Sequence, residues 1–307
     1  MDLQILAPDG VEEVLTGADL VALIGSHLPD LREGDIVLIT SKILSKSEGR
    51  VVDGERTDHV AAETSQIVAQ RGQTVIARTR LGIVQAAAGV DSSNLEVGKS
   101  ILLPLDPDAS ARSIREALLP NVAVVITDTA GRAWRTGQTD IAIGVAGIDV
   151  LDDHTGRTDS YGNTLAVTAP AIADELAGAA DLVKTKLGAR PLAVVRGLAE
   201  RVLPRGEHGP GAVALQRPID QDMFALGARE AVLAAVAGLH PECFGSPVDL
   251  DDLVQVLGRL GVVVLTEGGV VTATLAPDSN TPVSVVAQAL GWLATPVDAG
   301  WALTPRG

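Results

Sequence analysis

The sequence predicts a mixed α/β protein of the α+β kind, with a small α/β module at its C-terminal end. Strand-like apolar runs and helix-like periodic stretches both recur along the 307 residues, without the regular alternation of a doubly wound sheet. Hydrophobic residues make up 46% of the chain and aromatic residues only 2%, so Ala, Val, Leu and Ile must build the core. We expect a main domain over residues 1–245 and the module over 246–307.

Composition and charge exclude several classes of function. The net charge of −15 disfavours a nucleic-acid partner and an anionic membrane surface. The single cysteine, Cys243, excludes intrachain disulfides and a Cys-rich zinc site, and the five histidines have no metal-binding spacing. The N-terminal residues lack the basic region of a signal peptide, and no apolar run is long enough to cross a membrane. We therefore expect a cytoplasmic protein.

The first part of the main domain shows one clear strand and several helical patterns. The run IVLIT at 36–40 is apolar throughout, as in a strand buried on both faces. Apolar residues at helical spacing predict helices at 19–27, within 41–50 and at 59–71, the last one ended by Gly72. Residues 74–90 alternate in the manner of strands.

The remaining elements follow the same reasoning. We expect strands at 122–127 and 192–197 and helices at 110–119, 170–187 and 221–238; Pro170 suits the first turn of its helix. The segment CFGSP reads as a linker. Residues 249–304 read helix, hairpin, helix, strand, with the hairpin turn at residues 267–269. No internal repeat is evident in the sequence.

The segment VGKS at 97–100 resembles the end of a P-loop. The P-loop motif needs a glycine where this chain has Ser93, and the preceding DSSNLE is not an apolar strand. We interpret the segment as a turn.

Two lysines follow the strand IVLIT at helical spacing. Ser41 is placed to cap the helix, and Lys42 and Lys46 then share one face. Two cations there suit a phosphate chain. A solvated basic face paired with Glu48 explains the same pattern, so both interpretations stay open.

Asp128 carries the strongest site signal, because it ends an apolar run, as a metal-binding aspartate does at the mouth of a sheet. An aspartate that caps a turn before Gly131 is the simpler alternative. Arg132 and Arg135 favour a site, because two guanidiniums beside a carboxylate suit the binding of anions. Trp134 needs no role beyond packing.

Three weaker signals each have an ordinary structural explanation. Asp174 and Glu175 lie in the first turn of the helix at 170–187, where the helix dipole favours acidic residues, although two adjacent carboxylates also suit a pair of divalent ions. The loop TDSYGN at 158–163 has residue types that suit a substrate loop or any exposed turn. The loop HGPG at 208–211 could approach phosphates through its backbone.

Together these stretches resemble one family. The segments that carry the resemblance occur in that family's order and span residues 3–235: SKILSKSEGRVVD, AAAGVDSSN, LLPLDPDASARSIREAL, ITDTAGRAWRTGQTDIAIGVAG, TDSYGN, AVTAPAIADELAGAADLVK and VVRGL. The chain is similar to the coenzyme F420-0:L-glutamate ligases, which are GTP-dependent γ-glutamyl ligases of F420 biosynthesis. The resemblance implies an intertwined homodimer with a mixed α/β fold of its own.

The resemblance also implies the ligands of the site. Two divalent ions, Mg²⁺ or Mn²⁺, are expected, with K⁺ as a further candidate; Asp128 would hold one ion together with Asp174, and Glu175 the second. Guanosine nucleotide would be bound by Val11, Glu12, Glu13, Val14, Ser41, Lys42, Lys46, Gly209 and Gly211. The implied reaction phosphorylates the terminal carboxylate of F420-0 with GTP, and L-glutamate then displaces the phosphate. Arg132 and Arg135 are our candidates for binding a substrate anion.

One departure limits the resemblance. Some members continue into a flavin-binding, nitroreductase-like domain, and residues 246–307 are too few for it. Two other functions remain open: a nucleotide-dependent ligase that acts on a different carboxylate, and a protein that binds F420 or nucleotide without turnover. The presence of Asp128, Asp174, Glu175, Lys42 and Lys46 argues against loss of activity.

Overall fold

The computed structural model describes residues 2–93, 95–218, 221–222, 224, 226–267, 269–276 and 281–306. The chain forms two compact units, Met1–Pro218 and Ile219–Gly307. The boundary expected near residue 245 lies inside the second unit. The first two residues of the expected linker, Cys243 and Phe244, are the end of a short 3-10 helix, Pro241–Phe244. Among the described helices, none has the length and apolar character needed to span a membrane.

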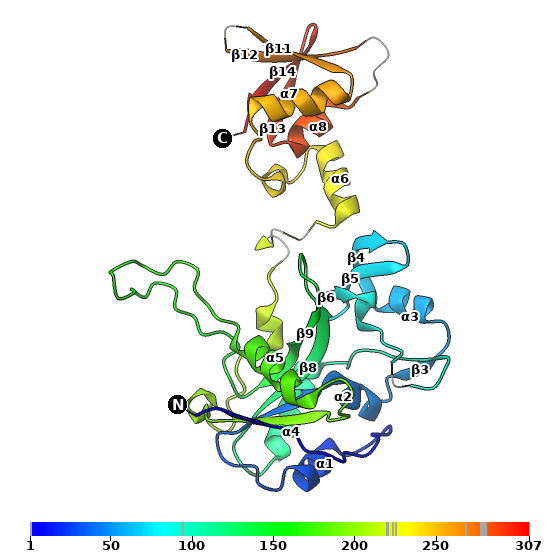
Figure 1. Ribbon diagram of the computed structural model, residues 1–307, viewed down its shortest axis with the longest axis vertical. Helices are drawn as coiled ribbons and strands as arrows, with labels where there is room; N and C mark the ends of the chain where they lie inside the picture. The colour runs from blue at the N-terminus through cyan, green and yellow to red at the C-terminus, as the bar shows by residue number, and fades with distance from the viewer. Residues whose placement is uncertain are drawn as a thin grey trace. The chain divides into compact units, whose positions relative to one another are not determined.

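A five-stranded mixed sheet forms the centre of the first unit (Figure 1). Its strands lie in the spatial order β1 (Gln4–Leu6), β10 (Leu192–Arg196), β2 (Ile36–Thr40), β8 (Ala123–Gly131) and β9 (Gln138–Ala146). Strands β2 and β8 run parallel, and the other neighbouring pairs are antiparallel. With helices on both faces, this sheet confirms the mixed α/β class.

Alternating side chains divide the core of the first unit into two layers. Val37 and Ile39 of β2 enter one hydrophobic cluster, and Ile36 and Leu38 enter the other. One face packs against three helices, α1 (Leu20–His27), α2 (Ser41–Ser47) and α4 (Pro107–Ala117). The other face packs against α5 (Ile172–Lys184). Burial on both faces explains why β2 reads as an unbroken apolar run.

Strand β8 is longer than expected. We expected it to end at residue 127, but it continues to Gly131 because the following residues pair with β9 in a long hairpin. Asp128 therefore lies within the strand, opposite Ile141, and does not end it. Its side chain points to the same face as Val124 and Ile126, because alternate residues of a strand share a face.

The helix expected at 59–71 is wrong in its second half. Helix α3 (Arg56–Glu63) ends early, and β4 (Thr64–Arg71) begins at once. The β-branched Thr64, Ile67 and Val68 favour a strand. The deciding interaction is non-local: β4 pairs with β5 (Thr74–Thr79), and β5 pairs with β6 (Val84–Ala86) to complete a three-stranded sheet.

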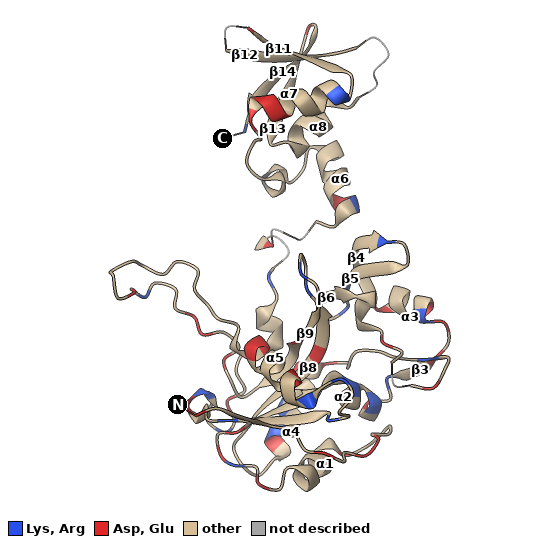
Figure 2. Cartoon of the chain, in the orientation of Figure 1, with Lys and Arg blue, Asp and Glu red and all other residues tan. Residues whose placement is uncertain are grey.

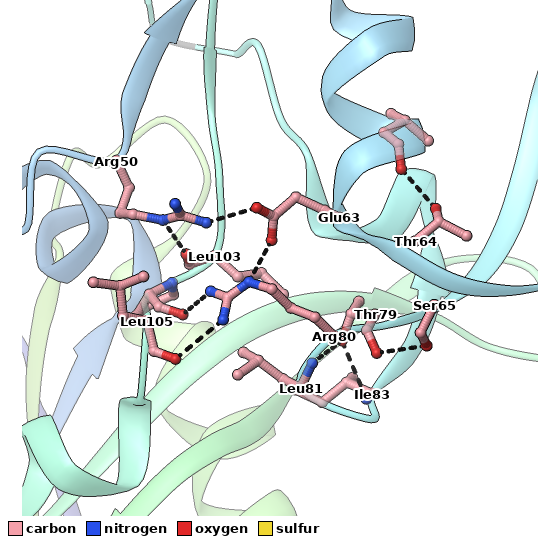
Figure 3. A network of polar contacts seen from close by, with 12 residues as sticks. Arg50, Glu63, Thr64, Ser65, Thr79, Arg80, Leu81, Ile83, Leu103 and Leu105 are labelled. Atoms are coloured by element: carbon pink, nitrogen blue, oxygen red, sulfur yellow. Dashed lines mark hydrogen bonds and ion pairs between the residues drawn. The ribbon is translucent and has the colours of Figure 1, made fainter.

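A buried carboxylate anchors this small sheet (Figure 3). Glu63 accepts hydrogen bonds from Arg50 and Arg80, each at 2.8 Å. The same two guanidiniums donate to backbone carbonyls that lead into α4, Arg50 to Leu103 and Arg80 to Leu105. One acid therefore connects β5 and the end of α3 to the segment before α4, and this fixes the place of β6. Strands β3 (Val51–Asp53) and β7 (Lys99–Ile101), which precede and follow this small sheet in the sequence, pair with each other in a two-stranded sheet.

The first half of the segment VGKS forms a turn, as we interpreted it, and its second half begins β7. Val97 and Gly98 precede β7, and Lys99 forms an ion pair with Glu96 at 2.8 Å. Helix α5 is shorter than the expected 170–187: it begins at Ile172 and ends at Lys184.

The second unit contains an internal repeat that the sequence did not reveal. Its elements are α6 (Ala228–Ala237), α7 (Leu250–Arg259), β11 (Val262–Glu267), β12 (Val270–Leu275), α8 (Val283–Ala289), β13 (Trp292–Val297) and β14 (Gly300–Pro305). The expected final strand is thus a second hairpin. Helix α6 begins later than the expected 221. The expected turn residue Gly268 lies outside the described residues, as do residues 223 and 225 of the expected helix.

The two copies of the repeat are each a helix, a Leu-Gly pair and a hairpin. The Leu-Gly pairs are Leu260-Gly261 and Leu290-Gly291, whose glycines have φ of 75° and 76°. Leu253 and Leu257 of the first copy correspond to Val283 and Ala287 of the second, and all four are buried in one cluster. Few residues besides the Leu-Gly pair are identical between the copies, so the sequence alone does not show the repeat.

Candidate functional site

Asp128 meets the start of helix α2. The Oγ of Ser41 donates a hydrogen bond to Asp128 Oδ1 at 2.7 Å. We had expected Ser41 to cap the helix. Ser41 is instead the first residue of α2 and is buried, and its hydroxyl contacts the sheet. This hydrogen bond thus joins the start of α2 to β8. Figure 2 marks basic positions in blue along α2 and acidic positions in red on α5 and the β8–β9 hairpin.

The environment of Asp128 disfavours its charged form. Burial raises the pKa of Asp128 to about 6, and the charge of Asp140 adds to the increase, while the hydroxyl of Ser41 and the backbone amide of Thr129 oppose it. At neutral pH the carboxylate is therefore ionised at a cost in free energy. A bound cation would relieve that cost.

A buried ion pair lies on the opposite face of the same strands. Lys184 Nζ, at the end of α5, donates to Asp140 Oδ2 at 2.7 Å and to Thr127 Oγ1 at 2.7 Å. Thr127 and Thr129 also donate to Asp140, at 3.0 and 2.9 Å. Sequence reasoning missed Lys184, because nothing in the sequence shows that the end of α5 reaches residue 140. The alternation of Thr127 and Thr129 around Asp128 is the only local signal for this arrangement.

The first turn of α5 also contacts the hairpin. Asp174 Oδ1 accepts a hydrogen bond from the backbone amide of Ala142 at 2.8 Å, beside an irregularity in the β8–β9 register. Burial raises the pKa of Asp174, and this hydrogen bond opposes the shift. Glu175 is exposed.

The metal site that we expected needs ligands beyond these side chains. Within the residues that the structure describes, no group of three His, Cys, Asp or Glu side chains could hold a metal ion. Asp128, with its raised pKa and the neighbouring Ser41 hydroxyl, still offers hard oxygen donors. Mg²⁺ is commonly held by one or two carboxylates, water and substrate oxygens, and the donors present fit that pattern. The three-carboxylate site remains a prediction.

The lysines of α2 have partners other than the one we considered. Lys42 donates to Asp91 at 2.7 Å, and Lys46 to Glu13 at 3.0 Å. Burial alone would raise the pKa of Asp91, but hydrogen bonds from Lys42 and Ser93 lower it to about 2. The pairing with Glu48 is wrong: Glu48 accepts from the backbone amide of Leu105 and the hydroxyl of Ser110.

The structure brings residues 11–14 to helix α2. The Lys46–Glu13 ion pair joins the two segments, and Val14 is buried in the same cluster as Ile43 and Leu44 of the helix. Val11 is half-buried and Glu12 is exposed. A cavity of about 530 Å³ lies nearby, lined by residues of α1, α2 and α4. Segments that the sequence separates by some thirty residues therefore share one region.

Comparison with known proteins identifies the family. The family model "F420-0:Gamma-glutamyl ligase" matches residues 10–63 and 53–197. A coenzyme F420:L-glutamate ligase of Methanothermobacter thermautotrophicus is 35% identical over 255 residues, which cover 73% of this chain and 99% of that protein. The chain belongs to the F420-0:gamma-glutamyl ligase family. Its members are enzymes.

Other members of the family give similar matches. The coenzyme F420:L-glutamate ligase of Archaeoglobus fulgidus is 36% identical over 222 residues, 64% of this chain and 89% of that protein. That of Halobacterium salinarum is 35% identical over 246 residues, 72% of this chain and 94% of that protein. The resemblance on which the sequence analysis relied is therefore confirmed. The match to the family model ends at residue 197, within the first unit.

Arg132 and Arg135 lie at the tip of the β8–β9 hairpin. The tip is exposed; Arg132 donates to the carbonyl of Thr136 at 2.7 Å, and Trp134, with φ of 61°, is 96% exposed. Among the described contacts, neither arginine reaches Asp128. The hairpin tip projects both guanidiniums into solvent, where they are available to an anion.

Gly209 and Gly211 are required by close packing. A Cβ on Gly209 would lie 2.5 Å from the carbonyl oxygen of Ile148, and one on Gly211 would lie 2.6 Å from Asp108. Asp108 accepts hydrogen bonds from the amides after Gly211, and the buried Arg115 donates to several carbonyls of the same loop. These contacts explain both glycines by the fold, so their contact with nucleotide remains a prediction.

The TDSYGN segment is the tip of a long arm. Backbone hydrogen bonds pair residues 152–159 with 163–170, and in Figure 1 the arm leaves the rest of the first unit. Asp159 closes the tip by accepting from the amides of Tyr161 and Asn163, each at 2.8 Å. Tyr161 is 90% exposed. The arm is a structured turn that offers its side chains to solvent.

Proposed function

We propose that this chain ligates L-glutamate to coenzyme F420-0 in coenzyme F420 biosynthesis, using GTP, and then extends the product by a γ-linkage. The family supports the reaction class, and the names of the relatives support the substrates. The observation that carries the proposal is the contact between Ser41 and Asp128. It joins the helix that bears the candidate phosphate-binding lysines to the candidate metal carboxylate.

The nucleotide is proposed to lie along helix α2. Lys42 and Lys46 lie one turn apart on this helix, and both are paired with carboxylates, which a nucleotide triphosphate would replace as their partner. Residues 11–14 reach the same helix, Glu13 through its ion pair with Lys46 and Val14 through packing against Ile43 and Leu44. Gly209 and Gly211 are proposed as further nucleotide contacts through their backbone.

Two divalent cations, Mg²⁺ or Mn²⁺, are proposed at the acidic side chains. Asp128 and Asp174 would hold one ion and Glu175 the second. When bound, these ions would neutralise charge on the phosphoryl group in transfer. Ser41 would hold the Asp128 carboxylate in place by its hydrogen bond, and the raised pKa values of Asp128 and Asp174 are consistent with carboxylates that await a cation.

The reaction follows from the chemistry of the substrates. A carboxylate oxygen of F420-0 attacks the γ-phosphorus of GTP, the bond to the β-phosphate oxygen breaks, and GDP leaves. The α-amine of L-glutamate then attacks the acyl carbon, phosphate leaves, and the nitrogen loses a proton to give the amide. Lys42 and Lys46 would stabilise the developing phosphate charge. Arg132 and Arg135 would bind a carboxylate or phosphate of a substrate.

The remaining proposals concern the assembly and its surroundings. We propose an intertwined homodimer in the cytoplasm, with K⁺ as a further candidate ion. A dimer would let the exposed arm at residues 152–170 and the exposed Glu175 meet a second chain. Light scattering of the purified protein tests the dimer directly.

The deciding experiment is a mass-spectrometric assay with F420-0, L-glutamate, GTP and Mn²⁺. We expect stepwise mass gains of one glutamate residue with the wild type and none with Asp128→Ala. Binding of GTP without any mass gain would instead support a different acceptor or a protein that binds without turnover. Replacement of GTP by ATP in a parallel reaction tests the choice of nucleotide.

A further inference from the structure

Trp134 is an exposed aromatic side chain at the end of the β8–β9 hairpin. We expected it to pack against its loop, but it is 96% exposed. Residues 1–218 contain only one other Phe, Trp or Tyr, which is Tyr161, whereas the two tryptophans of the second unit pack in a hydrophobic cluster. An aromatic side chain in water forgoes the burial that usually places it in a core or an interface. Packing within this unit therefore does not explain Trp134.

The backbone of the hairpin end also disfavours a tryptophan. The amide of Arg135 donates to the carbonyl of Arg132 at 3.4 Å, which closes a four-residue turn with Ala133 and Trp134 at its centre. Trp134 has φ of 61° at the third position of this turn, where glycine is preferred. A bulky side chain is strained in this conformation. Such strain is typical of functional sites.

The turn around Trp134 is basic, although the whole chain has a net charge of −15. Arg132 and Arg135 flank the tryptophan, and residues 129–139 include no Asp or Glu (Figure 2). Arg132 also donates to the carbonyl of Thr136 at 2.7 Å, which holds its guanidinium at the turn. An indole between two guanidiniums suits a ligand that combines a planar ring with an anionic group.

The strand that leads to this turn also carries Asp128. Six residues of chain separate Asp128 from Trp134, so their Cα atoms lie at most about 22 Å apart. In the proposed reaction the terminal carboxylate of F420-0 reacts near Asp128, and the planar deazaflavin ring lies at the other end of that molecule. The nucleotide, which is the other substrate with a ring, is proposed along helix α2. The hairpin is therefore free for F420-0.

We propose that Trp134 is a substrate-binding residue, whose indole stacks on the deazaflavin ring of F420-0 while Arg132 and Arg135 bind anionic groups of the same molecule. Stacking needs only the flat face of an aromatic side chain, so an exposed indole can supply it. The assignment rests on the proposed ligase function. It concerns a residue for which the sequence indicated no role beyond packing.

The test is a calorimetric titration of the full-length chain with F420-0, without GTP or L-glutamate. We expect Trp134→Gly to raise the Kd for F420-0 about tenfold, as loss of an aromatic stacking partner typically does. The same variant should unfold at the wild-type temperature or a higher one, because glycine suits the left-handed turn position. Trp134→Phe keeps an aromatic ring and should bind like the wild type, whereas Trp134→Leu is apolar without a ring and should bind like Trp134→Gly.

A matched control separates stacking from the loss of any exposed apolar side chain. Leu187, in the loop after α5, is 98% exposed, and Leu187→Gly should leave F420-0 binding unchanged. GTP binding should also be unchanged in Trp134→Gly. The inference is overturned if Trp134→Gly binds F420-0 like the wild type, or if it weakens GTP binding instead, which would assign the indole to guanine. A changed mass of Trp134→Gly in light scattering would assign the indole to a second chain and also overturn it.

The outcomes separate this inference from the proposed function. Product formation by the wild type together with unchanged F420-0 affinity in Trp134→Gly would reject the role of Trp134 alone. Weakened F420-0 affinity in Trp134→Gly together with no product from the wild type would reject the ligase reaction and keep the contact. A wild type that does not bind F420-0 would reject both.

Discussion

The ammonium of Lys184 lies 2.7 Å from Oδ2 of Asp140, and both side chains are about 5% exposed. This pair connects the last turn of α5 to β9, directly behind the strand that carries Asp128. At the other end of α5, Asp174 holds the amide of Ala142. The helix is thus attached to the hairpin at both ends, and the attachments set where Asp128 and Asp174 lie.

Loss of one member of the pair should be costly. Lys184→Met leaves the Asp140 carboxylate buried and unpaired, which typically lowers the free energy of unfolding by about 3–5 kcal/mol. Denaturant unfolding of the purified variant measures this change. The double variant Lys184→Met with Asp140→Asn removes both charges and should recover part of the loss. A single variant as stable as the wild type would show that the pair contributes little.

Replacement of Asp128 should stabilise the metal-free protein while it abolishes turnover. The pKa of Asp128 is raised from 3.8 to about 6, so between these values the folded chain binds more protons than the unfolded chain. The contribution of Asp128 to stability is therefore most favourable below about pH 4 and becomes less favourable as the pH rises to about 6. Asp128→Asn removes this dependence and should gain about 2–3 kcal/mol at pH 7 but little at pH 4.

Unfolding free energies at the two pH values, measured in the presence of a chelator, test this expectation. The same measurements on Glu200→Gln, which alters an exposed carboxylate of the first unit, serve as the control. An equal gain for Asp128→Asn at both pH values would contradict the role of ionisation.

Lys46 should govern nucleotide affinity. Lys46→Ala removes a cation of the proposed phosphate site, and we expect GTP binding to weaken about tenfold, the equivalent of 1.4 kcal/mol. Glu13→Gln frees Lys46 from its carboxylate partner and should strengthen GTP binding instead. Calorimetric titration measures both. Lys99→Ala, at a surface ion pair, is the control, and an effect as large as that of Lys46→Ala would argue against the site.

Gly211 should be essential to the first unit. Gly211→Ala combines a left-handed φ of 78° with a Cβ placed 2.6 Å from Asp108, so we expect a loss of about 2–4 kcal/mol. Gly206→Ala has a similar φ of 88° but nothing within 4 Å, and it should cost only about 1 kcal/mol. Thermal unfolding compares the two, and equal losses would show that steric contact with Asp108 is unimportant.

The sequence by itself predicted much of the fold. Strand β2 and helices α1, α2 and α4 follow from local signals, an apolar run and helical periodicity, although α4 begins at Pro107 and not at the expected residue 110. The turn at VGKS and the mixed α/β class were predicted for the same reason. The family followed from ordered motifs, because a set of segments in fixed order is far more specific than any one of them.

Tertiary structure decided the elements that depend on distant partners. Residues 64–71 form a strand and not a helix because β5 pairs with them. The repeat in the second unit appears only in three dimensions, because its copies share burial and a Leu-Gly pair more than residue identity. Local propensity is a weak preference, and a strand pairing that satisfies a whole backbone edge overrides it.

The site shows the same division. The sequence predicted Asp128 and the lysines of α2 as site residues, because each of these charged residues follows an apolar run that is typical of a strand. Their partners could not be read: Ser41 donates to Asp128, and Asp91 and Glu13 pair with the two lysines from other parts of the chain. Whether a polar side chain is paired, buried or left unsatisfied depends on what the fold places beside it, and only the tertiary structure determines that.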